Sequence, residues 1–132
     1  MNATADQTEK PKPALASLTR TSVLLASTPA AIWLILYFAL AAHLRLGLGR
    51  WPETIGDNPD TPLFKLHTEV VWRYFGYMLL SVFAVPLIVA VLVFIPSCRR
   101  HAVHFVVYAI AVGLAWLLMN LAPGSFVYWF FD

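Results

Sequence analysis

Three long stretches of the chain contain no charged residue, and this feature constrains the fold more than any other. Lys, Arg, Asp and Glu are all absent from residues 21–44, 74–98 and 101–131. Crossing about 30 Å of hydrocarbon takes about 20 mostly apolar residues in a helix that rises about 1.5 Å per residue. Each stretch is long enough to cross once. The sequence therefore predicts an all-α integral membrane protein with three transmembrane helices.

The composition agrees with lipid as the solvent. The 132 residues are 60% hydrophobic and 12% charged, with a mean hydropathy of +0.71, whereas soluble domains carry about 25% charged residues. The net charge of +2 is too small to suggest nucleic-acid binding. The single cysteine, Cys98, excludes an intrachain disulfide and a cysteine-based metal site. We expect one transmembrane domain over residues 22–132.

The N-terminal segment, residues 1–21, is polar, and its prolines discourage a helix. We expect a flexible tail. The first span is predicted at residues 23–42. An Ala-x-Ala string at residues 39–41 resembles a signal-peptide cleavage site, but this apolar run exceeds the 7–15 residues of a signal core. We favour a retained signal anchor.

Pro29 in the first span leaves two alternatives open. It either kinks a span that begins near Ser22, or starts a span that runs on to about Leu48. The second alternative requires Arg45 to extend its charged end to the headgroups. We prefer the kinked span because it places no charge at the membrane edge.

A turn-rich outer loop is predicted at residues 43–61. Gly47 and Gly49 release the backbone, and Trp51 precedes a proline that stops any helix. The sequence Asp-Thr-Pro at residues 60–62 is typical of a helix start, with a capping side chain followed by proline. The second helix should therefore begin at Pro62, outside the hydrocarbon.

The second helix is predicted to extend beyond the membrane and to bend. Lys65, Glu69 and Arg73 are four residues apart and should form one charged ladder. The span itself should cover residues 74–95, with a bend at Pro86, which cannot donate to the carbonyl four residues earlier.

A polar turn should connect this span to a third one at residues 102–122. The remaining segment, residues 123–132, is rich in aromatic residues, which concentrate at membrane interfaces. We expect this aromatic tail to lie along the surface, since it is too short to span.

Positive charge favours one orientation. With three spans, the N-terminal tail and the 97–101 turn share a side, which carries Lys10, Lys12, Arg20, Arg99 and Arg100. The other side carries Arg45, Arg50, Lys65 and Arg73. Because cytoplasmic loops are enriched in Lys and Arg, we expect a cytoplasmic N-terminus and a periplasmic C-terminus.

Two pairs of histidines are candidate ligands. His43 and His67 should lie on the same outer side and are able, as imidazoles from neighbouring helices, to bind haem axially. His101 and His104 are three residues apart on the opposite side, but a firm metal site needs a third or fourth ligand. We expect interfacial histidines at all four positions, and neither a metal nor a cofactor.

Helix-packing signals are the remaining candidates. Ala109 and Gly113 form one small-xxx-small pair in the third helix, and Ala111 and Ala115 form another. Such spacing lets helices approach closely in lipid, either within the chain or with a partner. Arg50 and Trp51 in the outer loop are of the types that anchor protein interfaces, although Trp also anchors chains at the lipid interface.

The loop LGLGRWPETIGDNPDTPLFKLH, residues 46–67, resembles that of small bacterial inner-membrane proteins with a similar Gly-Arg-Trp-Pro loop between their first two spans. The resemblance implies a bacterial inner membrane and no particular activity.

No phosphate-binding loop, G-x-S-x-G or H-E-x-x-H motif occurs. We therefore expect a non-catalytic accessory or structural subunit that packs against a membrane-protein partner or against itself. The alternatives are a small haem-binding redox subunit using His43 and His67, and an oligomeric transporter. The absence of charge within the spans disfavours the transporter.

Overall fold

The computed structural model describes residues 19–132, which form four helices. These are α1 (Arg20–Leu48), α2 (Pro62–Phe94), α3 (Arg99–Met119) and α4 (Gly124–Phe131). The first three are long and apolar enough to cross a membrane. Over the described range the fold is all-α with three transmembrane helices, as predicted.

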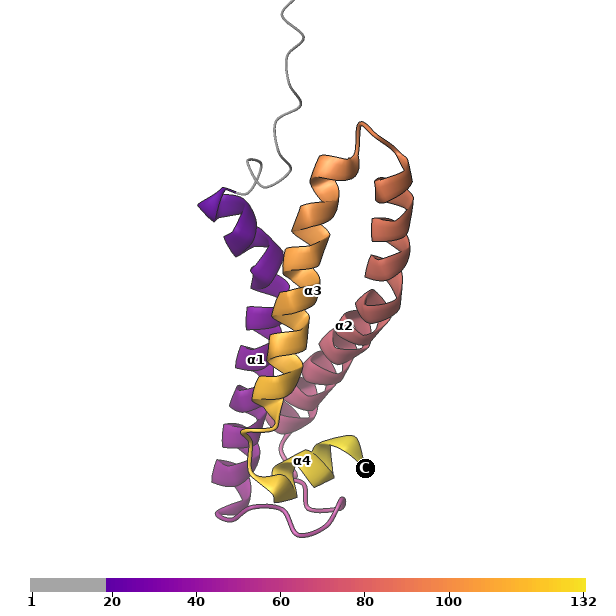
Figure 1. Ribbon diagram of the computed structural model, residues 1–132. Coiled ribbons are helices and arrows are strands. Elements are labelled where there is room, and N and C mark those ends of the chain that lie inside the picture. The colour runs from indigo at the N-terminus through magenta and orange to yellow at the C-terminus, as the bar shows by residue number, and fades with distance from the viewer. Residues whose placement is uncertain (1–18) are drawn as a thin grey trace, which may run out of the picture.

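The three long helices form an up-down-up bundle, and α4 lies across one end of it (Figure 1). α1 and α3 run side by side, whereas α2 leans away from them towards its C-terminal end (Figure 1). One end of the bundle is therefore covered by α4, and the opposite end carries the short connection between α2 and α3.

The first helix begins earlier than the sequence indicated. Thr19 is its N-cap: the Thr19 hydroxyl accepts a hydrogen bond from the Ser22 amide, and the Ser22 hydroxyl accepts one from the Thr19 amide. This reciprocal capping starts the helix at Arg20, so the predicted tail is wrong in its last two residues. The rest of that tail, residues 1–18, lies outside the described residues.

Pro29 lies inside α1, which continues through it. The first turns of α1 point away from the rest of the helix (Figure 1). The Thr28 hydroxyl donates to the Leu24 carbonyl at 2.8 Å, and the Tyr74 hydroxyl of α2 donates to the Pro29 carbonyl at 2.9 Å. The helix begins before Pro29, as the kinked alternative requires, but it also runs on to Leu48 and includes Arg45, as the other alternative requires. The residues that bound the span within the membrane therefore stay a prediction, and the Tyr74 bond fixes α2 to the kink.

The other end of α1 corrects the predicted loop boundary. The helix runs to Leu48, so the loop begins at Gly49 and its predicted start at His43 is wrong. Gly47 remains helical. A Cβ at this position would lie 2.6 Å from the Pro59 ring, so the absence of a side chain is what admits that ring. Only Gly49 releases the backbone, with a φ of 71° that ends the helix.

α2 begins at Pro62 as predicted, with the Thr61 hydroxyl accepting from the Phe64 amide at 3.2 Å. Its 33 residues span about 50 Å, well beyond the hydrocarbon thickness. The helix changes direction along its length (Figure 1), and Pro86 lies inside it. The extended, bent second helix is confirmed.

The predicted charged ladder on α2 is only partly present. Arg73 pairs with Glu69 one turn away. Lys65, however, pairs with Asp60 at 2.7 Å, before the helix start. The three charges therefore do not form one continuous ladder.

α3 is displaced from its predicted range of 102–122. It begins at Arg99, whose Nε donates to the Val93 carbonyl near the end of α2 at 2.7 Å. It ends at Met119, where the Asn120 side chain donates to the Trp116 carbonyl at 3.0 Å. Cys98 makes no capping side-chain bond at the start of α3, and the Arg99 bond instead satisfies a carbonyl at the end of α2.

The predicted aromatic tail forms a helix of its own, α4. Phe126 and Phe130 are almost completely buried, at 0% and 1% exposure. The Tyr37 ring of α1 lies 5.0 Å from the ring of Phe126 and 5.1 Å from that of Phe130. The Trp72 ring of α2 stacks on Phe130 at 4.9 Å. α4 is therefore part of the hydrophobic core, and the prediction of a tail merely lying along the surface is incomplete.

We expect Phe130→Ala to destabilise the loop end of the bundle by about 3–5 kcal/mol, because truncation of a buried aromatic side chain leaves a cavity. Hydrogen exchange of the α4 amides, together with thermal unfolding in detergent, measures the effect. Tyr128→Ala on the same helix is the control, since Tyr128 is 77% exposed. Equal effects of the two substitutions would contradict the docking of α4 through Phe130.

Candidate functional site

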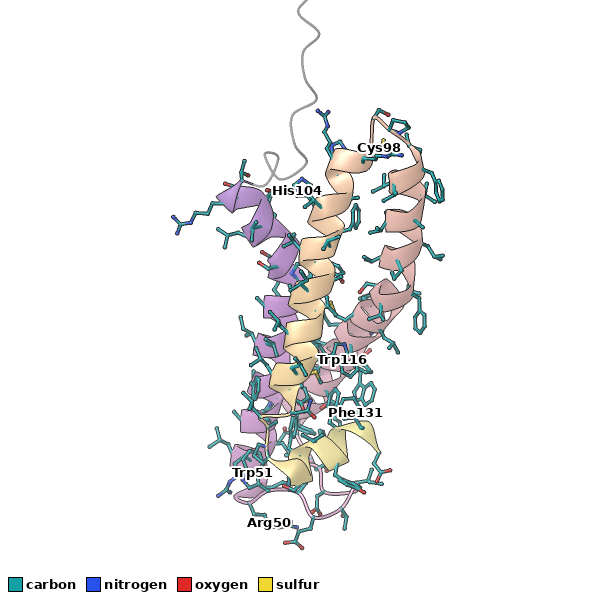
Figure 2. The ribbon with its side chains drawn as sticks, viewed as in Figure 1. Arg50, Trp51, Cys98, His104, Trp116 and Phe131 are labelled. Atoms are coloured by element: carbon teal, nitrogen blue, oxygen red, sulfur yellow. The ribbon has the colours of Figure 1, made fainter. Side chains whose placement is uncertain are left out.

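Polar side chains gather at two places in the described chain. We call the first the loop end; it comprises residues 43–67 and α4. We call the second the turn end; it comprises residues 95–104. Arg50 and Trp51 lie at the loop end, and Cys98 and His104 lie at the turn end (Figure 2). The loop end holds more of the predicted site residues.

One carboxylate orders the loop between α1 and α2. Asp57 Oδ2 accepts hydrogen bonds from the Glu53 amide at 2.8 Å and the Thr54 amide at 3.3 Å. It also pairs with Arg50 Nη1 at 3.0 Å. The backbone bond from Glu53, followed by the bond from Arg50, lowers the pKa of Asp57 below its ordinary value. The loop is thus held in one shape by an ionised side chain.

The two predicted interface residues of the loop face different ways. Arg50 is exposed, with 48% of its side chain accessible. Trp51 is half-buried and packs against the core, and the Arg45 guanidinium lies 5.8 Å from its ring centroid. Trp51 therefore secures the loop to the bundle. The exposed apolar side chain of the loop is Ile55, at 55% exposure, which the sequence analysis did not select.

His43 and His67 are brought into direct contact. Their Nδ1 atoms lie 3.0 Å apart and their ring centroids 5.3 Å apart. One ring donates a proton and the other accepts it, so at least one ring is neutral. A haem iron takes one imidazole on each face of its macrocycle. The haem hypothesis therefore stays a prediction that requires these two rings to separate.

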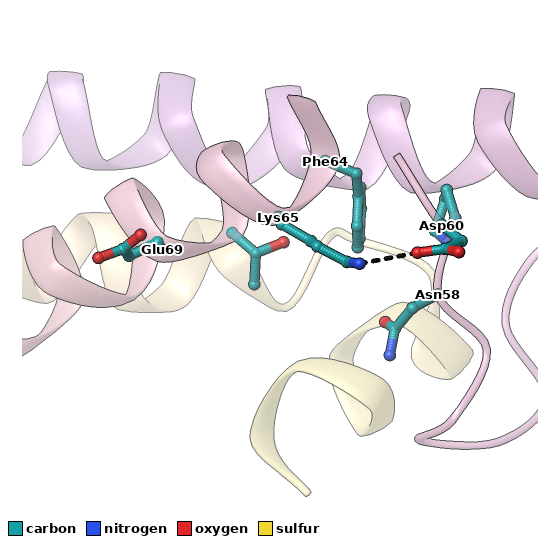
Figure 3. A pocket seen from close by; sticks show the side chains of 7 residues that line it. Asn58, Asp60, Phe64, Lys65 and Glu69 are labelled. Carbon is teal, nitrogen blue, oxygen red and sulfur yellow. Dashed lines mark hydrogen bonds and ion pairs between the residues drawn. The ribbon is translucent and has the colours of Figure 1, made fainter. Parts of the chain in front are cut away.

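A hollow of about 400 Å³ lies beside the start of α2 (Figure 3). It is lined by Asn58, Pro59, Asp60, Phe64, Lys65, Thr68 and Glu69. Its lysine is already paired with Asp60, which lowers the pKa of that carboxyl group, and Glu69 is paired with Arg73. Because these charges are matched and well exposed, the hollow has no unbalanced charge to attract an ion.

A second hollow, of about 600 Å³, separates the loop from α4. Its walls include Glu53 and Ile55 of the loop, and Tyr128 and Asp132 of the C-terminal segment. This hollow could not be predicted from the sequence, because it exists only where α4 docks against a loop that lies about 70 residues earlier in the chain.

The two small-residue pairs of α3 are used differently. Ala115 is buried in the core, at 1% exposure. Ala109 and Gly113 are exposed and line a groove of about 400 Å³ between α2 and α3, together with Pro86 and Trp116. A Cβ added at Gly113 would meet nothing within 4 Å. The Ala109–Gly113 pair is therefore not used for packing within the chain.

The turn end has fewer candidate ligand residues than the loop end. His101 is exposed, whereas His104 is half-buried and its Nδ1 has no hydrogen-bond partner. No group of three or more His, Cys, Asp or Glu side chains that could hold a metal occurs within residues 19–132. The i, i+3 histidine pair therefore lacks the companions of a firm metal site.

Comparison of the chain with protein-family models, with curated proteins and with solved structures finds no match.

We expect Asp57→Asn to loosen the loop, because a neutral amide loses the ion pair with Arg50 and is a weaker acceptor for two backbone amides. Hydrogen exchange at Glu53 and Thr54 should become faster. Asp60→Asn is the control, since Asp60 bonds only to the exposed Lys65. Unchanged exchange in the Asp57 variant would contradict its ordering role.

The same bonds give a pH dependence with a defined sign. Because the pKa of Asp57 is lowered in the folded loop, its contribution is complete above the ordinary carboxyl value of about 3.9. It is lost as the pH falls through the lowered value. The protection of the loop amides, measured as the exchange rate corrected for its intrinsic pH dependence, should therefore fall on acidification, and this fall should be absent in Asp57→Asn.

Proposed function

We propose that the protein is a non-catalytic accessory or structural subunit of a bacterial inner-membrane complex, formed with a membrane-protein partner or with further copies of itself. The observation that carries this proposal is the outward-facing Ala109–Gly113 pair, which lines an open groove between α2 and α3.

The physics of helix association in lipid supports this use of the groove. Lipid tails are as apolar as a helix surface, so close packing drives association, and small residues permit it. Within the chain, α3 packs with Ala115 buried. Gly113 on the other face has open space in front of it. A helix from outside the chain is able to approach there closely.

The rigid loop end supports the same proposal on the water side. Asp57 fixes the loop shape, and the loop presents the exposed side chains of Arg50 and Ile55. An ordered loop loses less conformational freedom on binding than a flexible one. We propose that it contacts the part of the partner that lies outside the membrane.

The orientation is part of the proposal. Arg99 and Arg100 lie beside the shortest connection between two spans, and short cytoplasmic loops are enriched in such residues. We propose a cytoplasmic N-terminus and a periplasmic loop end and C-terminus.

A reporter fused after Asp132 tests this orientation. An enzyme that is active only after export, such as a periplasmic phosphatase, should be active in the fusion, and a reporter that requires the cytoplasm should be inactive. The opposite pattern would reverse the proposed topology.

The subunit proposal predicts that the protein solubilised from its native membrane in mild detergent elutes in a complex larger than its monomer. Gly113→Leu should shift it to the monomer, because a large side chain fills the groove while meeting no atom of the chain itself within 4 Å of its Cβ. Size-exclusion chromatography with light scattering measures the shift.

Gly76→Leu is the matched control. Gly76 is also an exposed helical glycine with open space around its Cβ, but it lies on α2 outside the groove. It should leave the complex intact. A wild-type protein that elutes only as a monomer, or equal effects of the two substitutions, would contradict the proposal.

A further inference from the structure

We propose that the His43–His67 pair is a pH switch at the loop end. At neutral pH the contact holds the last turns of α1 against the first turns of α2, and it opens when both rings are protonated. This inference is independent of the proposed subunit function. It depends on two imidazole nitrogens, one from each helix, that face each other at 3.0 Å.

The positions of the protons decide whether this contact attracts or repels. In the neutral pair, one ring donates its Nδ1 proton to the Nδ1 lone pair of the other ring. A first added proton binds the free Nε2 of the donor ring and leaves this hydrogen bond in place. A second proton has only the accepting Nδ1 left to bind. Both Nδ1 atoms then carry hydrogen, so the bond is lost and two positive rings repel each other.

The surroundings of the pair resist the second proton. Both rings are half-buried, and the buried Phe64 ring meets the His43 ring edge-on at 5.3 Å. His67 lies in the part of α2 that precedes the predicted span at residues 74–95. Burial, followed by the charge of His43, lowers the pKa of His67 below its ordinary value.

Neighbouring charges do not offset this repulsion. Arg45 of α1 directs its guanidinium to the Trp51 ring. Residues 109–119 of α3 contain no titratable side chain. The charged and titratable side chains of the loop, of residues 62–73 and of α4 with its C-cap are exposed or paired with one another: Arg50, Glu53, Asp57, Asp60, Lys65, Glu69, Arg73, Tyr128 and Asp132. The charge that acts on His67 is that of His43.

The switch has a defined pH window. Because the pKa of His67 is lowered in the closed contact, the contact contributes fully above the ordinary histidine value of about 6.5. It is lost as the pH falls through the lowered value. Within this window, an opening step that takes up one proton becomes about tenfold more favourable for each pH unit. Asp57 and Asp60 stay ionised there, since their pKa values lie below 3.8.

The distance between the two helices tests the switch. Spin labels on Leu46→Cys of α1 and Leu63→Cys of α2, in the full chain with Cys98→Ser, leave the core unchanged because both leucines are exposed, at 82% and 66%. Double electron–electron resonance in detergent should give a longer and broader distance distribution at a pH of about 4.5 than at about 7.5, on the two sides of the ordinary histidine value.

Two double variants separate this pair from the other histidines. His43→Asn/His67→Asn in the labelled chain should remove the pH dependence, because amide side chains keep a donor and an acceptor but take up no proton. His101→Asn/His104→Asn, at the turn end, is the matched control and should respond as the labelled parent does. A distance that does not change with pH in the parent, or a change that survives in His43→Asn/His67→Asn, would overturn the proposal.

A second measurement does not require the His43→Asn/His67→Asn variant to fold. His101→Asn/His104→Asn leaves His43 and His67 as the remaining histidines of the four in the chain, so imidazole ¹⁵N resonances of this variant report on the pair alone. The pair should titrate in two steps, the second of them below about 6.5. Two rings that both titrate at or above that value would also overturn the proposal.

Discussion

Every backbone amide and carbonyl that enters the hydrocarbon must find its partner inside the protein, because lipid offers none. This constraint explains the three long helices, and it explains what happens where they are interrupted. At the kink in α1, the Thr28 hydroxyl and the Tyr74 hydroxyl each donate to a backbone carbonyl. The proline kink is therefore also the point at which α2 is fastened to α1.

The bundle has two unlike ends. At the loop end, α4 inserts Phe126 and Phe130 among the rings of α1 and α2, and Asp57 holds the loop above them. Towards the other end, α2 bends away from α1 and α3 (Figure 1). The proposed subunit role relies on the ordered loop end and on the groove between α2 and α3.

Features that depend on neighbouring residues could be predicted from the sequence. The charge-free stretches predicted the spans, and Thr61 followed by Pro62 predicted the start of α2. Contacts between segments that are far apart in the chain could not be predicted from the sequence. Gly47 was expected to release the backbone, yet it is helical, and its missing side chain makes room for Pro59, 12 residues later. Likewise, the eight-residue aromatic helix α4 could not be predicted, because the aromatic rings that contact it belong to the distant helices α1 and α2. The histidines were expected on one side, but their 3.0 Å contact depends on the full length of α1.

The three long helices require lipid around them, because large apolar side chains face outward. Phe83, Leu87 and Val91 of α2, for example, are 66%, 69% and 58% exposed. Alkaline carbonate extraction of the native membrane tests this most directly, because it strips peripheral proteins and leaves spanning ones behind. We predict that the chain remains in the membrane pellet. Its release into the supernatant would contradict the three-span architecture.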